Sequence, residues 1–200
     1  VDYGIRLGQA FARSGQAGEQ FFFVFHYALG SRDEVGNQVD AALGLHPHDA
    51  RELTDERLAE LGRLATEEKV AAIGEIGLDY YRELCPRELQ QPALRKPLRL
   101  AHEVGKPVIL HCRQEEGAGA SGQSGQAYRD LFVILRECLK PPIRGLLHCF
   151  SGDLATAREA LEMGLHLSFA GNLTFAKAEP LRAVAKEVPL EKVVLETDAP

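Results

Sequence analysis

The residue types most able to do chemistry in this chain stand at or near the ends of apolar runs. His111 ends the run in VILHCR, and His148 lies near the end of GLLHCF. Glu75 sits inside AAIGEIGLD, and Asp198 follows the apolar residues of VVLETDAP. A carboxylate in an apolar strand is costly unless it is paired or bound to metal. Imidazole and carboxylate together suit Zn, Mn or Fe, or Mg with more oxygen ligands. The four residues together predict a metal site, although a hydrogen-bonded structural histidine or a buried Glu–Arg pair would explain any one of them alone.

Two more histidines flank a proline in GLHPHDA. His46 and His48 are two residues apart, so in an extended chain their side chains share a face. We expect His46 to reach the site. For His48, a place in the site and a hydrogen-bonded loop position are equally open.

Arg113 follows His111 by two residues and is expected to point inward with it. Its guanidinium could clamp a substrate phosphate through a fork of hydrogen bonds. The alternative is an ion pair with Glu75 or Asp79. Asp79 itself could orient a ligand histidine or cap a turn.

Asn172 and Thr174 in AGNLTF could contact substrate or only shape a turn. Cys112 and Cys149 each follow a candidate ligand histidine directly. Because neighbours in a strand face opposite sides, we expect both thiols to pack in the core.

The elements that must position these residues alternate between short apolar runs and longer helical patterns. Most runs are apolar on both faces, which is typical of a parallel sheet covered by helices. Strands are expected at 21–25, 40–45, 70–76, 107–111, 145–150, 166–169 and 192–196. Helices are expected after Thr54 and at 88–104, 154–163 and 178–187, with Pro92 and Pro97 each breaking or kinking the second. Residues 115–126, EEGAGASGQSGQ, indicate a flexible loop.

This alternation of strands and helices fits a doubly wound sheet or a (β/α)8 barrel. Polar groups at the carboxyl ends of successive strands favour the barrel, which gathers its chemistry on that face. Only seven strands are visible, so we expect an α/β fold, an incomplete (β/α)8 TIM barrel, in a single domain over residues 1–200.

Composition limits the function. Lys+Arg 23 against Asp+Glu 29 gives a net charge of −6, which excludes a strongly basic nucleic-acid coat. No apolar run is long enough to span a bilayer, and no secretory signal is evident. The four cysteines form no CxxC pair and no disulfide framework, so we expect reduced thiols and a cytoplasmic setting, with a four-thiolate zinc site as the alternative.

Six strings in series resemble the TatD family of metal-dependent deoxyribonucleases, within the metal-dependent hydrolase superfamily of (β/α)8 barrels. They are GLHPHDA, IGEIGLDYY, KPVILHCR, LLHCFSG, SFAGNLTF and LETDAP, and the resemblance covers about residues 39–200. It implies hydrolysis of phosphodiester bonds, typically in DNA, with one or two divalent cations (Zn, Mg or Mn).

The resemblance also implies residue roles. Glu75 would be a bridging carboxylate, completed at the second metal site by His111 and His148. Asp198 would bind the first metal and help to take a proton from the attacking water. His46 would lie near the scissile phosphate. Substrate binding would fall to three residues: Arg113, His48 and Asn172.

The chain departs from the family pattern at its start. The DxHxH strand whose histidines hold the first metal is absent, and residues 1–38 match poorly. We therefore expect a barrel truncated at both ends that binds one ion well and a second weakly. We also expect a monomer that acts on DNA and has no membrane partner. The alternatives are a metal hydrolase of a small ester or amide, or a metal-binding remnant without activity.

Overall fold

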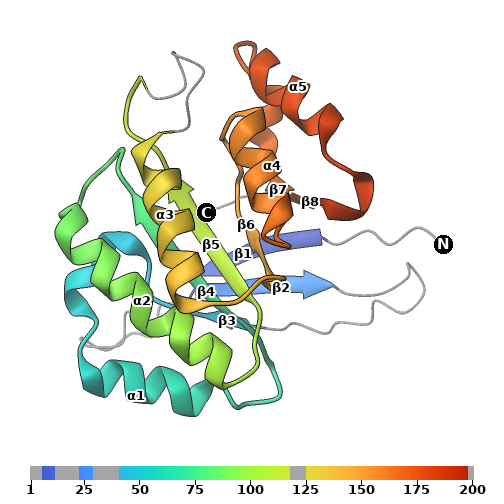
Figure 1. Ribbon diagram of the computed structural model, residues 1–200. Coiled ribbons are helices and arrows are strands. Elements are labelled where there is room, and N and C mark those ends of the chain that lie inside the picture. The colour runs from blue at the N-terminus through green and yellow to red at the C-terminus, as the bar shows by residue number, and fades with distance from the viewer. Residues whose placement is uncertain (1–5, 12–22, 29–40, 118–124, 198–200) are drawn as a thin grey trace.

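The computed structural model describes residues 6–11, 23–28, 41–117 and 125–197, with side chains from Ala41 onward. Eight strands form one sheet in the order β2-β1-β8-β7-β6-β5-β4-β3 (Figure 1). The strands are β1 Arg6–Phe11, β2 Phe23–Ala28, β3 Ala41–Leu43, β4 Val70–Asp79, β5 Val108–Arg113, β6 Gly145–Leu147, β7 His166–Phe169 and β8 Val193–Glu196. From β3 to β8 each strand is parallel to the next strand along the chain, which is the order of a (β/α)8 barrel.

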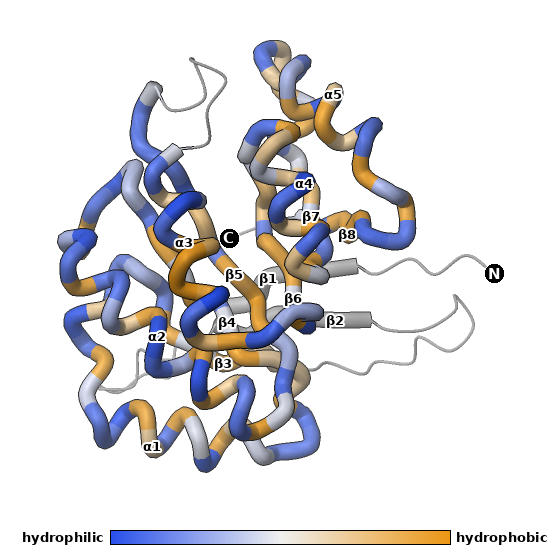
Figure 2. Tube along the Cα trace, in the orientation of Figure 1, coloured by the Kyte–Doolittle hydropathy of each residue, from blue (hydrophilic) through white to orange (hydrophobic). Residues whose placement is uncertain are grey.

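Helices follow the parallel strands and cover one face of the sheet. They are α1 Asp55–Leu64, α2 Arg87–Glu103, α3 Gln126–Cys138, α4 Leu154–Glu162 and α5 Glu179–Glu187, with short 3₁₀ turns η1 Pro47–Glu52, η2 Gly171–Thr174 and η3 Leu190–Lys192. Helix α2 packs on β4, α3 on β5 and α4 on β7, and α2 and α3 lie side by side (Figure 1). The strands under them are predominantly apolar, whereas the helices carry hydrophilic residues between apolar ones (Figure 2). The main core lies between these two layers.

A second, smaller apolar cluster lies on the other face of the sheet and indicates that the sheet curls. Its members come from five strands: Ala42, Ala72, Ile109, Leu146 and Val194. In a flat sheet β3 and β8 would be about 24 Å apart, at about 4.8 Å per strand. Their side chains share one cluster because the parallel strands curve around it. The fold is an incomplete (β/α)8 barrel, as predicted.

Strand β4 carries an irregularity that decides which face Glu75 occupies. Ile73 pairs with Val108 and Ile76 with Leu110, so three steps on β4 match two on β5. Such a bulge re-aims the side chains on either side of it. Ile73 and Ile76 therefore both pack in the core beneath the helices, although they are an odd number of residues apart.

Several sequence predictions need correction. The run at 21–25 was expected in the parallel sheet, but β2 pairs antiparallel with β1, a strand that was not predicted. Residues 21 and 22 lie outside the described part of the chain. Helix α2 runs through Pro92 and Pro97 and is not broken. Burial of Leu94, Leu98 and Ala101 in the core offsets the backbone hydrogen bonds that the prolines cannot make.

Helix α3 was missed altogether, although its pattern is evident in the sequence. Tyr128, Leu131, Phe132 and Leu135 are buried at the spacing of one helix face. Of the expected loop 115–126, residues 118–124 lie outside the described part, and Gln126 begins α3. None of the helices in the described part of the chain combines the length and the apolar character that a membrane span requires.

Candidate functional site

The carboxyl ends of the parallel strands surround a cavity of about 760 Å³. Seven of the eight residues predicted for the site line it: His46, His48, Glu75, His111, Arg113, His148 and Asn172. The eighth, Asp198, lies outside the described residues. Curvature of the sheet brings these side chains together, because inward positions at successive strand ends point toward one axis.

Strand alternation explains which side chains reach the cavity. His111 is two residues beyond Ile109, and His148 is two beyond Leu146, both in the inner apolar cluster. Each histidine therefore continues the inward-facing row one step closer to the carboxyl end. The inner apolar cluster therefore lies directly beneath the polar site.

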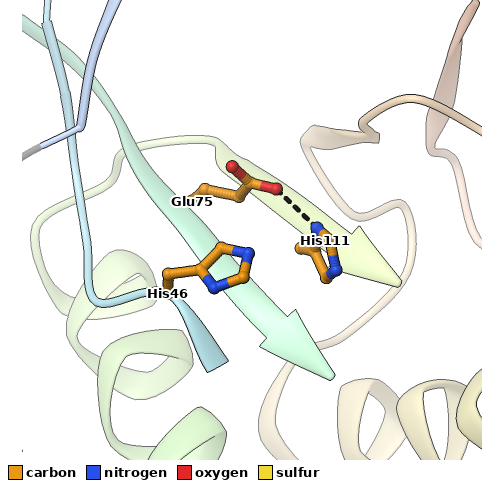
Figure 3. A group of neighbouring side chains, drawn as sticks. All are labelled: His46, Glu75 and His111. Carbon is orange, nitrogen blue, oxygen red and sulfur yellow. Dashed lines mark hydrogen bonds and ion pairs between the residues drawn. The ribbon is translucent and has the colours of Figure 1, made fainter. Parts of the chain in front are cut away.

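Glu75 lies close to His46 and His111 at the centre of the site (Figure 3). Its Oε1 is 2.7 Å from His111 Nδ1 and 3.8 Å from His148 Nε2. Potential ligand atoms of Glu75, His111 and His46 all lie within 4.8 Å of one another. A carboxylate and imidazoles at such separations are the ligand types that bind zinc and related divalent ions, so the donor set fits a metal.

Gly44 lets the loop that carries His46 come close to Glu75. A Cβ on Gly44 would lie 2.7 Å from the carbonyl carbon of Gly74. Real side-chain carbons do not approach backbone so closely, so β3 and β4 can meet here only without one. His46 follows Gly44 by two residues, and Glu75 follows Gly74 directly.

The electrostatics favour a charged Glu75 and His111 in the metal-free site. Burial works to raise the pKa of Glu75, but the hydrogen bond and positive charge of His111 lower it to about 2. Burial likewise works to lower the pKa of His111, but contacts with Asp79 and Glu75 raise it to about 9. A metal ion bound through His111 would therefore displace a proton.

His46 differs from His111 in its electrostatics. Burial, with repulsion from His111, lowers the pKa of His46 to about 3, so the ring is neutral at ordinary pH. Its Nδ1 accepts a hydrogen bond from the backbone N–H of His48 at 3.2 Å. A neutral imidazole has one N–H, so the proton of His46 is on Nε2. With its lone pair engaged and Nε2 protonated, this histidine is set up as a hydrogen-bond donor.

Asp79 fulfils both roles that the sequence left open. Its Oδ2 lies 2.8 Å from His48 Nε2 and 3.3 Å from His111 Nε2, so it orients both rings. Its Oδ1 accepts from the backbone N–H groups of Tyr81 and Arg82 and caps the turn after β4. His48 thus joins the site through Asp79.

Arg113 points into the cavity, and its guanidinium stacks 4.2 Å from the centroid of the Tyr81 ring. The alternative ion pairs with Glu75 and Asp79 are not among those of the described residues, where both carboxylates pair with histidines. Asn172 lines the cavity and donates to the carbonyl of Phe150 at 3.4 Å. Thr174 bonds the carbonyl of Gly171 and shapes the turn.

The two cysteines beside the ligand histidines behave differently. Cys112 packs in the core beneath the helices, as predicted, although it also borders the cavity. For Cys149 the prediction is wrong, because this residue is half-buried and lines the cavity. Strand β6 ends at Leu147 and Cys149 has a φ of +43°, so strand alternation does not extend to it.

Sequence reasoning missed Glu196. Its side chain is 1% exposed, and Oε2 lies 2.5 Å from His148 Nδ1. The signal was present, since Glu196 is an acidic residue in an apolar strand, two positions before Asp198 and two after the inward-facing Val194. The same alternation that selects His111 would have selected it.

Comparison with known proteins agrees with this geometry. The family model described as "TatD related DNase" matches residues 23–200. The chain belongs to the TatD family. A protein named "Uncharacterized metal-dependent hydrolase YabD", from Bacillus subtilis (strain 168), is 39% identical to it over 160 residues, covering 80% of this chain and 58% of that protein. The "3'-5' ssDNA/RNA exonuclease TatD" of Cronobacter sakazakii is 38% identical over 158 residues, covering 78% and 56%.

Among solved structures, a TatD homologue from Escherichia coli K12, YjjV, superposes with a TM-score of 0.70 at 33% identity. It covers 84% of this chain and 61% of its own length. The chain therefore spans about 56–61% of the length of these TatD relatives.

Proposed function

We propose that this chain forms part of a divalent-metal-dependent hydrolase that cleaves phosphodiester bonds of DNA. The observation that carries the proposal is the Glu75 carboxylate held between two histidines at the floor of an open cavity. Two arginines, Arg82 and Arg113, line the same cavity and would attract an anionic substrate. The names of relatives that act on single-stranded DNA and RNA support this substrate class.

Glu75, His111 and His148 would hold one ion, the second site of the family pattern. When bound there, a divalent ion would activate water for attack and offset negative charge on the phosphate. Asp198, outside the described residues, would take a proton from the attacking water. The DxHxH histidine pair of the family's first site does not occur in these 200 residues, so calorimetric titration with Zn or Mn should give one tight site. Two comparable tight sites would contradict this part of the proposal.

His46 would contact the substrate phosphate. Its Nε2–H is a donor, because Nδ1 accepts from the backbone of His48. A buried, neutral N–H donor can hydrogen-bond a phosphoryl oxygen and strengthen that bond as charge develops. His48 and Asn172, which share the cavity, would assist substrate binding.

Arg113 is expected to act mainly in substrate binding. Stacking on Tyr81 holds its guanidinium in place, so little side-chain entropy is lost when it meets a phosphate. Replacing Arg113 with Ala should raise KM for single-stranded DNA about tenfold, the loss of one charged hydrogen-bonding contact of ~1.4 kcal/mol, with a smaller change in kcat. Steady-state kinetics would measure both constants, and an unchanged KM would contradict the role.

Hydrolysis of end-labelled single-stranded DNA with Mg, Mn or Zn, with and without a chelator, tests the proposed activity. We expect cleavage that the chelator abolishes. Raising the salt concentration should lower the cleavage rate only modestly, because the net charge is −6. A parallel panel of small esters and amides tests the second candidate substrate class. Turnover of that panel without DNA cleavage would replace the nuclease assignment. Metal binding with no turnover would identify a non-catalytic remnant.

The four free cysteines support a reducing, cytoplasmic setting as part of the proposal. The single domain over residues 1–200 and the monomeric state stay predictions.

A further inference from the structure

Glu196 is a buried carboxylate whose two oxygens both reach the end of another strand. Oε2 lies 2.5 Å from His148 Nδ1, and Oε1 accepts from the backbone N–H of Cys149 at 2.6 Å. Strand β7 lies between β6 and β8 in the sheet, so these contacts cross the inside of the curve. The side chain is 1% exposed, and water has little access to compete for it.

Both neighbours of Glu196 must act as donors. The peptide N–H of Cys149 can only donate a hydrogen bond, and a carboxylate can only accept one. A ring nitrogen with a lone pair would be repelled by an oxygen 2.5 Å away, so Nδ1 of His148 carries a proton. One oxygen accepts the hydrogen bond from Cys149 and the other lies in close contact with Nδ1 of His148, an arrangement that suits a carboxylate better than an amide.

We propose that Glu196 is a positioning residue, which holds His148 as the tautomer protonated on Nδ1 and thereby leaves the lone pair on Nε2 for the metal. This inference rests on the metal site of the proposed function. Nε2 of His148 is the nitrogen that faces Glu75, 3.8 Å from its Oε1. A neutral imidazole has one lone pair, so the hydrogen bond at one nitrogen determines which nitrogen can bind a cation.

The test begins with the chain free of metal and labelled with ¹⁵N-histidine. Long-range ¹H–¹⁵N NMR spectra distinguish protonated from bare ring nitrogens, and a His148→Gln spectrum assigns the signals. We expect a protonated Nδ1 in His148 of the unmodified chain. In Glu196→Gln we expect this tautomer to lose population. Affinity for Zn or Mn, measured by calorimetry, should fall about 10–100-fold, the usual cost of losing the partner of a ligand histidine.

Glu159→Gln is the matched control, because Glu159 is an exposed carboxylate on α4 paired with Arg136 at 2.6 Å. It should change neither the tautomer nor the affinity. A bare Nδ1 on His148 in the unmodified chain would overturn the proposal, and this readout stands even if Glu196→Gln does not fold. An unaltered tautomer with affinity within twofold in Glu196→Gln would also overturn it. Failure of the unmodified chain to bind metal would refute the proposed function and leave the tautomer result intact.

Discussion

Replacement of Glu75 with Gln is expected to lower DNA hydrolysis by about 10²–10³-fold, the loss typical when one charge-stabilising group is removed from an active site. Gln keeps the volume of the side chain but removes the negative charge that lies between His111 and His148. Affinity for a divalent ion should fall as well, because an amide oxygen is a poorer ligand than a carboxylate. Calorimetric titration and the initial rate of single-stranded DNA cleavage measure the two effects.

A matched control is Glu137→Gln, which removes an exposed carboxylate on α3 paired with Arg95 at 2.6 Å. This variant should bind metal and turn over substrate like the unmodified chain. If Glu75→Gln retained ion affinity and hydrolysis within threefold, the cavity at the strand ends would not be the catalytic site. Circular dichroism of both variants would establish that the fold is kept.

Replacement of Gly77 with Ala is expected to destabilise the fold by about 3 kcal/mol or more, beyond the usual cost of a tolerated core change. Gly77 pairs with His111 across β4 and β5 and has a φ of +156°. A Cβ there would overlap the carbonyl oxygen of His111 and lie 2.7 Å from its carbonyl carbon. The obstructing atoms are backbone, so relief requires the two central strands to separate and His111 to shift.

Urea unfolding of the metal-free chain measures this loss as a change in the free energy of unfolding. Gly171→Ala is the control, because a Cβ at Gly171 has open space around it and should leave stability nearly unchanged. Gly77→Ala with stability within 1 kcal/mol of the unmodified chain would mean that β4 and β5 are not in this close register.

Local sequence patterns alone determined much of this protein. The strand 166–169 was predicted with the bounds that β7 has, and α4 and α5 were predicted to within one residue at each end. Apolar runs identify buried strands because burial on both faces leaves few polar positions. The parallel strands then carry His111, His148 and Glu75 to one face, so the candidate site followed from the residues at the strand ends.

Tertiary structure decided what depends on partners distant in the sequence. Alternation along one strand predicts a face, but the bulge in β4 and the early end of β6 change that face for Glu75 and Cys149. Local pattern also could not predict strand direction, since the same apolar run can form a parallel or an antiparallel pair. Strand β2 pairs antiparallel with β1. The contact of Glu196 with His148 exists only because the sheet curls and brings β8 across to β6. Sequence encodes residue type and periodicity, whereas register, curvature and partners are set by packing of the whole chain.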